Sequence, residues 1–301
     1  MASEGMDPRN QNLLIYVADR LLPREDAKVS VFDSSVQAGD SVWEGLRVYD
    51  GRIFKLDEHL ERLEQSAKAL AFAEIPDRDS IKAALFETLK ANRMRDGVHI
   101  RLKLTRGEKI TSNMDPRVNR SGPCLIIIPE WKPPRFTASG IRLITSATRR
   151  NTPQCLDSKI HHGNLLNNIL AKIEAIAAGV DEALMLDIHG FVSETNSTNV
   201  FLVQREELLT PHADACLPGI TRRVVMEIAR SQGIPVVERN ISLGEVYASD
   251  EMFATGTVGE LTPILEVDGR VIGNGQPGPL TQKLRAGYAE LTAREGDLIP
   301  F

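Results

Sequence analysis

The chain has 301 residues, of which 42% are hydrophobic and 26% are charged, and its formal net charge is −5. This composition is ordinary for a globular protein, and the length exceeds that of a typical single domain, so we expect two domains. Acidic and basic residues are interspersed, and no basic stripe or polybasic helix points to nucleic acid or a membrane surface. The longest apolar run, residues 124–128, is too short to cross a bilayer.

The three cysteines, Cys124, Cys155 and Cys216, are widely spaced and include no Cys-x-x-Cys pair. This pattern is typical of reduced thiols in a cytosol. The first twelve residues are polar and contain no apolar segment of the secretory type. We therefore expect a cytoplasmic protein.

The first half mixes strands with amphipathic helices. Asp50-Gly51 supplies the positive φ angles of a tight turn, which predicts a hairpin over residues 48–54. Alternating and three-to-four-residue apolar patterns predict the remaining elements. These are strands at 13–17, 28–32 and 97–106, and helices at 56–72 and 79–92.

Three prolines within residues 129–135 oppose both a helix and a central strand, so we predict a linker at 129–138. This gives an N-terminal domain over residues 1–128 and a C-terminal domain over 139–301. In the second half, strands at 141–145, near 236 and at 252–254 and helices at 221–232 and 279–294 are expected, with a hairpin at Asp268-Gly269. Strands and helices do not alternate strictly, which favours two α+β domains.

The first candidate catalytic residues lie between Cys155 and Asn199. Lys159 lies in a polar loop before a helix whose apolar residues recur at three- and four-residue spacing, which predicts a buried face, and Gly179 ends that helix. Glu194 follows a short apolar strand. A lysine and a later acid could be a Schiff-base lysine and its electrostatic partner, although most lysines are solvated surface charges.

Three segments of this stretch resemble the class IV, or fold type IV, aminotransferases, which are pyridoxal-phosphate enzymes. They are Lys159 with the following Asn164-Leu165-Leu166-Asn167-Asn168, then residues 181–187, then Glu194 with Asn199-Val200-Phe201. The resemblance covers nearly the whole chain. It implies a two-domain fold type IV architecture, pyridoxal 5′-phosphate as cofactor and a homodimer.

By this resemblance, Lys159 forms the Schiff base and Glu194 pairs with the pyridine nitrogen. Lys172 is the rival lysine, although a surface charge near Glu174 explains it equally well. Leu217-Pro218-Gly219-Ile220-Thr221 opens a helix and resembles the phosphate-binding motif of the family, in which free amides and a hydroxyl meet the phosphate.

The same resemblance assigns phosphate contacts to Ile220, Thr221, Thr257 and Arg62. Without it, Arg62 could simply pair with Glu58 on an exposed helix face. Backbone amides next to Thr257, including that of Val258, would receive the substrate carboxylate. The His161-His162 pair cannot chelate through one helix face and has no third ligand at metal spacing, so no metal is expected.

The substrate is inferred from residues 42–47, Val-Trp-Glu-Gly-Leu-Arg, which resemble the Phe-Glu-Gly-Ile-Arg segment of branched-chain aminotransferases. Trp43 and Arg101 would contact substrate, with Arg101 receiving the distal carboxylate of glutamate or 2-oxoglutarate. Ala38 stands where those enzymes carry an aromatic residue, and Gly39-Asp40 resembles D-amino acid aminotransferases.

We therefore expect transfer of an amino group from an L-branched-chain amino acid to a keto acid such as 2-oxoglutarate. A D-amino acid or (R)-amine transaminase and an aminodeoxychorismate-type lyase of the same fold remain alternatives, as does a cofactor-binding protein without catalysis.

Overall fold

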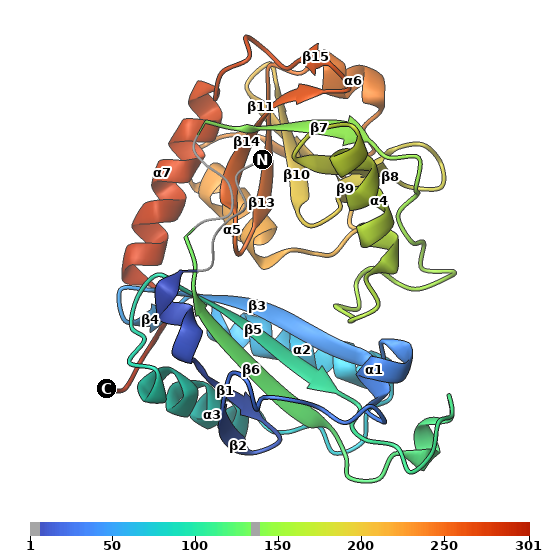
Figure 1. The fold of residues 1–301 in the computed structure, drawn as a ribbon. Coiled ribbons are helices and arrows are strands. Elements are labelled where there is room, and N and C mark those ends of the chain that lie inside the picture. The colour runs from blue at the N-terminus through green and yellow to red at the C-terminus, as the bar shows by residue number, and fades with distance from the viewer. Residues whose placement is uncertain (1–6, 134–138) are drawn as a thin grey trace. The chain divides into compact units, whose positions relative to one another are not determined.

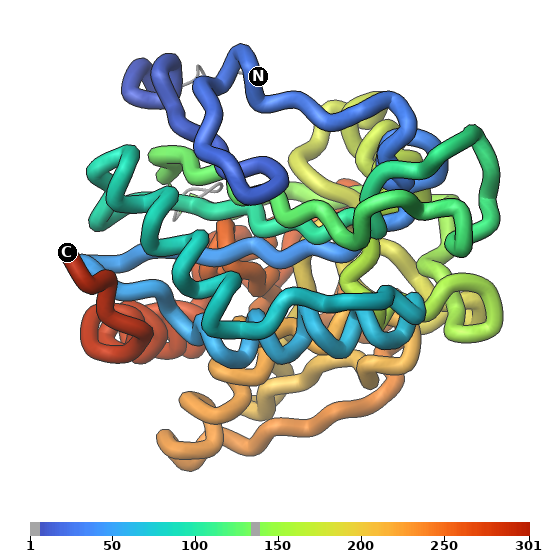
Figure 2. Tube along the Cα trace, turned by 90° about the horizontal axis from the view of Figure 1, so that it is seen from below, coloured from blue at the N-terminus to red at the C-terminus, as the bar shows by residue number. Residues whose placement is uncertain are grey.

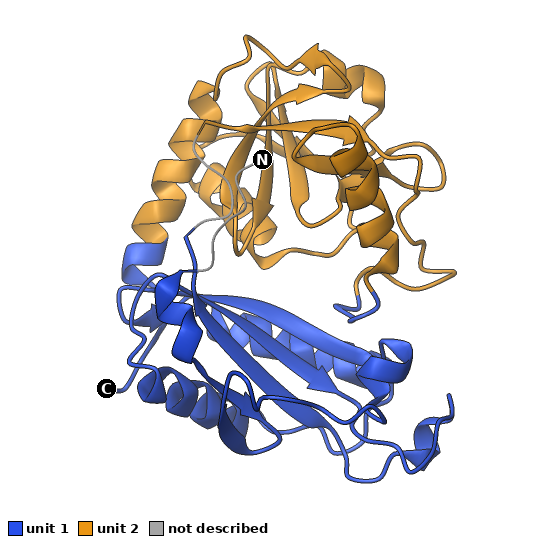
Figure 3. Ribbon diagram, viewed as in Figure 1, with its two compact units in different colours: residues 1–133, 160–164, 292–301 blue, residues 134–159, 165–291 orange. Residues whose placement is uncertain are grey.

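A computed structural model describes residues 7–133 and 139–301, and the chain divides into two compact units (Figure 3). Unit 1 comprises residues 1–133, 160–164 and 292–301, and unit 2 comprises residues 134–159 and 165–291. Each unit has its own sheet and its own helices (Figure 1). The predicted fold class, two α+β units, is confirmed.

The predicted linker differs in part from what is found. Residues 129–131 continue strand β6 instead of leaving the sheet, because Pro129 lies opposite Ile100 in a register that runs to Trp131. Residues 134–138 of that segment lie outside the described residues. The last ten residues of the chain, which we assigned to the second domain, belong to unit 1.

Unit 1 contains a seven-stranded antiparallel sheet in the order β16-β4-β3-β5-β6-β1-β2. Its strands are β1 (Leu14–Val17), β2 (Arg20–Pro23), β3 (Ser41–Tyr49), β4 (Arg52–Ile53), β5 (Val98–Thr105), β6 (Cys124–Trp131) and β16 (Asp297–Leu298). The predicted hairpin joins β3 to β4, and φ is 42° at Asp50 and 76° at Gly51. Both angles are positive, as such a turn requires.

The helices of unit 1 are α1 (Ser34–Ala38), α2 (Leu56–Ala69) and α3 (Arg78–Ala91), with 3₁₀ turns at Pro8–Asn12 and Pro116–Val118. Helix α2 packs on β3, and α3 packs on β1 and β6. Figure 2 looks at this face of the sheet, and both helices lie in front of the strands. Their apolar faces form the core with Ile100 and Leu102 of β5, and all of these side chains are almost fully buried. Burial of such side chains stabilises the unit by about 1.5–3 kcal/mol each.

The strand predicted at residues 28–32 is absent, so that prediction is wrong. Val31 is 73% exposed and Phe32 is 42% exposed. The segment runs directly into Asp33, whose side chain caps α1 by accepting from the Ser35 amide. β-branched residues alone do not make a strand where no neighbouring strand offers hydrogen bonds.

Unit 2 contains a nine-stranded sheet in the order β12-β11-β10-β13-β14-β7-β8-β9, with β15 paired to β14. Its strands are β7 (Ile141–Thr145), β8 (Glu182–Leu186), β9 (Val192–Thr195), β10 (Asn199–Gln204), β11 (Glu207–Thr210), β12 (Val236–Glu238), β13 (Glu251–Gly256), β14 (Glu260–Val267) and β15 (Arg270–Val271). Its helices are α4 (Leu166–Ala177), α5 (Ile220–Ser231), α6 (Leu243–Tyr247) and α7 (Pro279–Arg294). In the described parts of the chain, no helix is both long and apolar enough to cross a membrane.

Helix α4 ends before Gly179, as predicted, but its apolar face is not buried as we expected. The side of α4 that enters the core carries only small residues, Ala171 and Ala175, which pack against Ala183 and Met185 of β8. The large apolar residues are half-exposed or more, namely Leu166, Ile169, Leu170, Ile173 and Ile176. The spacing was correctly recognised, but spacing alone does not tell which apolar residues face the core of the same chain.

Residues 160–164 leave unit 2 and lie along the free edge of β3. The Trp43 amide donates to the His161 carbonyl at 3.0 Å, and the Gly163 amide donates to the Ser41 carbonyl at 2.6 Å. Val42 and His162 form a β-bridge. Since β4 pairs only with the last residues of β3, this segment covers the part of the edge that would otherwise be unpaired.

Candidate active site

Glu194 lies on β9 and is almost completely buried. Its Oε1 accepts a hydrogen bond from Arg150 Nε at 2.6 Å, and its Oε2 accepts from Asn199 Nδ2 at 3.1 Å. The Leu217 amide lies 3.4 Å from Oε2. A buried carboxylate is therefore held in place by two side chains of unit 2.

The groups around Glu194 offset only part of the cost of burying its negative charge. Burial raises the pKa of Glu194 above its ordinary value, although the charge and hydrogen bond of Arg150 act in the opposite direction. Burial, with the negative charge of Glu194, also raises the pKa of the Cys216 thiol to about 12. A cation or an N–H donor bound to Glu194 would stabilise its ionised form.

The predicted phosphate-binding helix start is formed by α5, of which Ile220 is the first residue and Gly219 the N-cap. No side chain caps this end, so the amides of the first turn remain available. Thr221 is buried. A Cβ placed on Gly219 would lie 2.1 Å from Asn199 Oδ1, so only glycine permits this close approach to Asn199.

Strand β13 and the turn after it supply two further threonine hydroxyls. Thr255 lies opposite Asn199 in the register of β10 and β13, and Thr257 follows the end of β13. Within the described residues, Thr255 Oγ1 is buried and has no hydrogen-bond partner. An unsatisfied buried hydroxyl is costly, which points to an acceptor that this site is built to receive.

Of the two candidate lysines, Lys159 is the one that remains available. Its side chain is 45% exposed, and its Nζ lies 4.0 Å from Asp157 Oδ1. Its positive charge is among those that oppose the rise in the pKa of Cys216. Lys172, by contrast, donates to the Asp181 carbonyl and lies 3.2 Å from Glu182 Oε1.

Unit 1 contains a second buried carboxylate, Glu44 on β3, which is fully buried. Arg62 donates to it twice, from Nε at 2.8 Å and Nη2 at 2.7 Å. His59 and His161 each approach it through Nδ1, at 2.7 and 3.0 Å. Burial alone would raise the pKa of Glu44, but Arg62 and His161 outweigh it and hold the pKa well below its usual range.

Trp43 and Arg101 lie together in unit 1. The Arg101 guanidinium carbon is 4.1 Å from the Trp43 ring centroid, a cation–π geometry. Burial lowers the pKa of Arg101, with the Glu130 charge opposing that shift. Arg101 also lines a cavity of about 310 Å³ with Leu13, Arg24 and Glu130 among its walls.

The other two predicted substrate residues lie in different units. Ala38 is the last residue of α1 in unit 1 and is exposed, and Val258 lies in the turn between β13 and β14 in unit 2.

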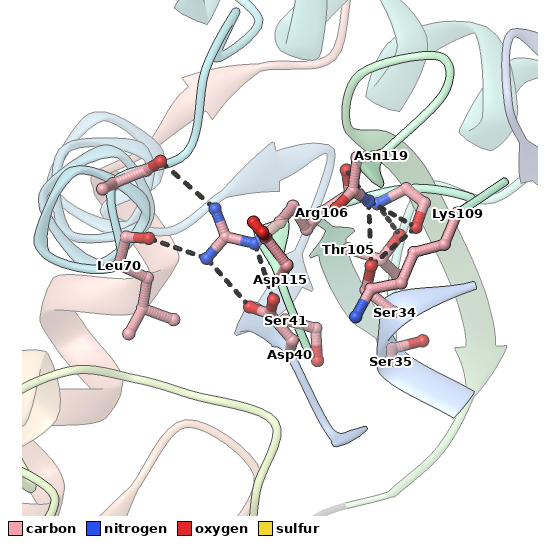
Figure 4. Close-up of polar contacts among 12 residues, drawn as sticks. Ser34, Ser35, Asp40, Ser41, Leu70, Thr105, Arg106, Lys109, Asp115 and Asn119 are labelled. Atoms are coloured by element: carbon pink, nitrogen blue, oxygen red, sulfur yellow. Dashed lines mark hydrogen bonds and ion pairs between the residues drawn. The ribbon is translucent and has the colours of Figure 1, made fainter. Parts of the chain in front are cut away.

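Asp40, part of the segment that resembled D-amino acid aminotransferases, has a structural partner (Figure 4). Arg106 donates to it from Nε at 2.6 Å and from Nη2 at 3.1 Å. The same guanidinium donates to the Leu70 carbonyl at 2.7 Å and to the Ala71 carbonyl at 3.1 Å. Asp40 thus fixes an arginine that ties the end of α2 to the sheet, which accounts for it without a role in substrate choice.

Sequence reasoning missed several residues of these networks, namely Arg150, Asn199, Thr255, Glu44, His59 and His161. Asn199 and Glu44 lie inside the motifs that resemble the family. Thr255 could have been identified from its position opposite Asn199 in the sheet. Arg150 is 44 residues from its partner Glu194, and nothing in its local sequence distinguishes it from other arginines.

Comparison with known proteins shows the family of the chain. The family model "Amino-transferase class IV" matches residues 41–267. "Branched-chain-amino-acid aminotransferase-like protein 2" of Arabidopsis thaliana is 58% identical over 97% of this chain and 53% of its own. "Putative branched-chain-amino-acid aminotransferase" of Methanocaldococcus jannaschii is 42% identical over 94% of this chain and 97% of its own.

Among solved structures, the branched-chain amino acid aminotransferase of Escherichia coli has a TM-score of 0.89. It is 30% identical and covers 95% of this chain and 96% of its own. A T.th. branched-chain amino acid aminotransferase complexed with N-(5′-phosphopyridoxyl)-L-glutamate has a TM-score of 0.87, is 34% identical and covers 94% of each chain.

The present chain spans about half the length of the Arabidopsis relatives that it matches. It nevertheless covers nearly the full length of the Methanocaldococcus relative. The family model and the similarity to several members along nearly the whole chain lead to one conclusion: the chain belongs to the class IV aminotransferases.

Proposed function

We propose that this chain is a pyridoxal-phosphate-dependent aminotransferase that moves the amino group of an L-branched-chain amino acid to 2-oxoglutarate. The observation that carries the proposal is the buried Glu194, fixed by Arg150 and Asn199 but incompletely compensated. A protonated pyridine nitrogen is the kind of partner that such a carboxylate lacks.

The residues present fit this cofactor. Glu194 would accept from the ring nitrogen. The phosphate would be held at the α5 N-terminus, where Gly219 approaches Asn199 closely and the Thr255 hydroxyl lacks a partner among the described residues. We propose as phosphate ligands the Ile220 amide, the Thr221 and Thr257 hydroxyls and the Arg62 guanidinium, whose orientation Glu44 fixes.

When bound, pyridoxal phosphate supplies an electron sink for the carbon from which the amino group leaves. The protein contributes the positioning and the proton transfers. We assign covalent attachment of the cofactor to Lys159 Nζ, which is then free to carry a proton once the amino acid has replaced it. Lys172 is unsuitable because its ammonium group is already engaged with Asp181 and Glu182.

For the substrate, Arg101 would bind the distal carboxylate of glutamate or 2-oxoglutarate, and Trp43 would provide an apolar surface beside it. The T.th. enzyme was solved with a phosphopyridoxyl-glutamate compound, which supports glutamate as one substrate here. We also keep Ala38 as part of the pocket wall and the Val258 amide as a ligand of the α-carboxylate.

The test is turnover of purified protein with pyridoxal phosphate, L-leucine and 2-oxoglutarate. We expect 4-methyl-2-oxopentanoate and glutamate in equal amounts. When 2-oxoglutarate is omitted, the keto product should not exceed one equivalent of enzyme. Faster conversion of D-alanine or (R)-1-phenylethylamine would instead favour the alternative transaminases, and repeated turnover without any keto acid acceptor would favour a lyase.

The lysine assignment has its own test. Borohydride reduction of the cofactor-loaded protein followed by peptide mapping should locate the pyridoxyl group on Lys159, and Lys159→Ala should abolish the labelling while Lys172→Ala retains it. A label on any other residue would refute the assignment.

The phosphate ligands can be tested by cofactor affinity. Thr221→Ala and Arg62→Ala each remove a hydrogen bond or charge and should weaken binding by about 1–3 kcal/mol. Arg62→Lys keeps the charge next to Glu44 and separates loss of affinity from loss of stability. Unchanged cofactor dissociation in both alanine variants would contradict the proposed ligands.

We further propose that the chain forms a homodimer. The exposed apolar residues of α4 support this, because a strip of five large aliphatic side chains is unusual on a monomer surface. Ile169→Glu with Ile173→Glu should shift the mass measured by light scattering from that of two chains to that of one, whereas Lys172→Gln on the same helix should not.

We propose a cytoplasmic location, supported by three cysteines that form no disulfide. Fractionation of cells that express the complete protein, followed by immunodetection, tests this proposal.

A further inference from the structure

The Arg150 guanidinium is shared between two acceptors of unit 2. Its Nε donates to Glu194 Oε1 at 2.6 Å, and its Nη1 donates at 3.3 Å to Oδ1 of Asn167, in the first turn of α4. Within the described residues, Nη2 makes no hydrogen bond. The side chains of Arg150 and Glu194 are each only 6% exposed, so water competes little for these groups.

This sharing differs from the usual pairing of an arginine with a carboxylate. A guanidinium beside a carboxylate commonly forms a fork of two parallel hydrogen bonds. Arg62 forms such a fork with Glu44, from Nε at 2.8 Å and Nη2 at 2.7 Å. Arg150 gives Glu194 one bond only, although it is the more deeply buried of the two arginines. Solvent therefore does not explain the missing second bond.

Asn167, the other acceptor of Arg150, is itself held in one orientation. Its Nδ2 donates to the Arg149 carbonyl at 2.8 Å, which turns Oδ1 toward Arg150. The reversed amide would place a donor against a donor and an oxygen against an oxygen. Glu174 of the same helix accepts from the Ala147 amide at 2.7 Å, so α4 also holds the segment before Arg150. Because a guanidinium is rigid and planar, bonds on two of its edges fix its rotation.

The acceptor positions of Glu194 indicate what this arrangement achieves. An ionised carboxylate offers about four such positions. Arg150 occupies one of them, and Asn199 Nδ2 and the Leu217 amide occupy two more, at 3.1 and 3.4 Å. One position therefore remains for a further donor. A complete fork from Arg150 would fill it.

The charges that face Glu194 agree with an unfilled position. Burial raises the pKa of Glu194, and Arg150 opposes this rise through its charge and its hydrogen bond. The Leu217 amide and the charge of Arg222 act in the same direction as Arg150, and the Cys216 thiol also lies near the carboxylate. Together these groups do not bring the pKa of Glu194 back to its ordinary value.

We propose that Asn167 is a positioning residue of the cofactor site, which holds the second edge of Arg150 and so keeps one acceptor position of Glu194 open for the pyridine N–H. The inference rests on the proposed function. It concerns unit 2 alone, to which all three residues belong. In this assignment Asn167 touches neither cofactor nor substrate and acts only through Arg150.

The decisive variant is Asn167→Ala. Without Oδ1, the released edge of Arg150 can turn to Glu194 and complete the fork. We therefore expect the pKa of Glu194 to fall by about one unit or more. The affinity for pyridoxal phosphate should fall by about tenfold, because the fork competes with the hydrogen bond from the ring nitrogen. A merely structural role would lower stability and leave the pKa of Glu194 unchanged.

Two neighbouring substitutions serve as comparisons. Asn167→Asp keeps an oxygen for Arg150 and adds a negative charge, so the pKa of Glu194 should not fall. Asn168→Ala is the matched control, because its Nδ2 donates to the Asn196 carbonyl at 3.0 Å and it makes no bond to Arg150 within the described residues. This control should change neither the pKa of Glu194 nor the cofactor affinity.

The first measurement needs no activity. In ¹³C NMR of the cofactor-free protein with carboxyl-labelled glutamate, the signal of Glu194 is identified by its loss in Glu194→Gln, and its titration gives the pKa. In wild type this pKa should lie above the ordinary value. In an Arg150→Lys background, Asn167→Ala should no longer lower it, because a single ammonium cannot form the fork.

The second measurement is the dissociation constant of pyridoxal phosphate, obtained by titration into each variant and followed by absorbance. In Asn167→Ala, an unchanged or raised pKa of Glu194, or an unchanged cofactor affinity, would overturn this inference and leave the proposed function intact. A wild-type Glu194 that titrates below its ordinary value would do the same. A wild type that binds no pyridoxal phosphate would overturn the proposed function and this inference together.

Discussion

Glu44 in unit 1 and Glu194 in unit 2 are both buried carboxylates that pair with an arginine, yet the pKa of Glu44 is lowered and that of Glu194 is raised. The desolvation of the two groups is similar. The difference lies in the donors, because Glu44 receives two hydrogen bonds from Arg62 and one from each of two histidines. Glu194 receives one bond from Arg150, one from Asn199 and a long one from an amide.

An arginine close to a buried acid therefore does not by itself determine the protonation of that acid. The full set of hydrogen-bond donors decides whether the carboxylate oxygens are all occupied or can still accept a hydrogen bond from a further partner. Glu44 accepts four hydrogen bonds and orients the groups that donate them. Glu194 accepts fewer and longer hydrogen bonds, which is what the proposed contact with the cofactor requires.

The largest effect should come from Glu44→Ala. Removing this buried carboxylate deprives the half-buried Arg62 of two hydrogen bonds, and breaking such a pair costs about 3–5 kcal/mol. Chemical denaturation of the cofactor-free protein measures it. Glu64→Ala removes a carboxylate that is bonded to Lys68 and Arg78 on the surface and should cost less than about 1 kcal/mol. Equal losses in the two variants would contradict the distinction between Glu44 and an ordinary ion-pair acid.

Gly219→Ala should perturb the surroundings of Glu194 from the backbone side. The new Cβ would lie 2.1 Å from Asn199 Oδ1, so Asn199 must move and its bond to Glu194 is disturbed. We expect a loss of about 1–3 kcal/mol in stability, together with weaker cofactor binding. Gly244→Ala in α6 is the control, since its Cβ would meet nothing closer than 3.8 Å. Wild-type stability and cofactor affinity in Gly219→Ala would show that the close approach is unimportant.

The opposite pKa shifts predict opposite dependences on pH. The lowered pKa of Glu44 contributes stability that is present above its unfolded pKa, near 4.5, and is lost as the pH falls below it. The raised pKa of Glu194 makes its ionised form unfavourable, so its contribution to stability declines as the pH rises above 4.5.

The measurement is the free energy of unfolding between pH 4 and 7 for wild type, Glu44→Gln and Glu194→Gln without cofactor. The stability advantage of wild type over Glu44→Gln should shrink as the pH falls below 4.5 and stay level above it, whereas the advantage of wild type over Glu194→Gln should decline as the pH rises above 4.5. Each slope is limited to about 1.4 kcal/mol per pH unit. Slopes of the same sign would refute the contrast.

The smallest effect is expected at Thr255, whose hydroxyl is buried and has no partner within the described residues. Thr255→Val should leave the cofactor-free protein as stable as wild type or up to about 1 kcal/mol more stable, and should weaken cofactor binding. Thr262→Val is the matched control, since Thr262 Oγ1 donates to the Gly259 carbonyl at 2.9 Å and its loss should be destabilising. Tighter cofactor binding by Thr255→Val would argue against a ligand at this hydroxyl.

Local sequence signals predicted much of this fold. The Asp50-Gly51 and Asp268-Gly269 turns were identifiable because both residues of such turns need positive φ, and these angles are found. The helix at 279–294 was predicted from its apolar spacing and is present with those bounds. The error at residues 28–32 arose because strand formation depends on a neighbouring strand, which local composition does not reveal.

The site was less predictable for a related reason. Arg62 and Glu194 were singled out through family motifs, but their partners Glu44 and Arg150 come from other elements. Only the folded arrangement brings such residues together. The orientation of α4 was missed because an apolar stripe is equally compatible with a core and with an interface.

The path of the chain has a consequence for how the protein is synthesised. Unit 1 takes its edge segment from residues 160–164 and its terminal strand β16, which pairs with β4, from residues 297–298. During translation, the first 133 residues emerge long before the strand that completes their sheet, so unit 1 cannot reach its final structure on the ribosome ahead of unit 2. Unit 1 is therefore the last to be completed, and neither unit can be exchanged between homologues as one uninterrupted segment of a gene.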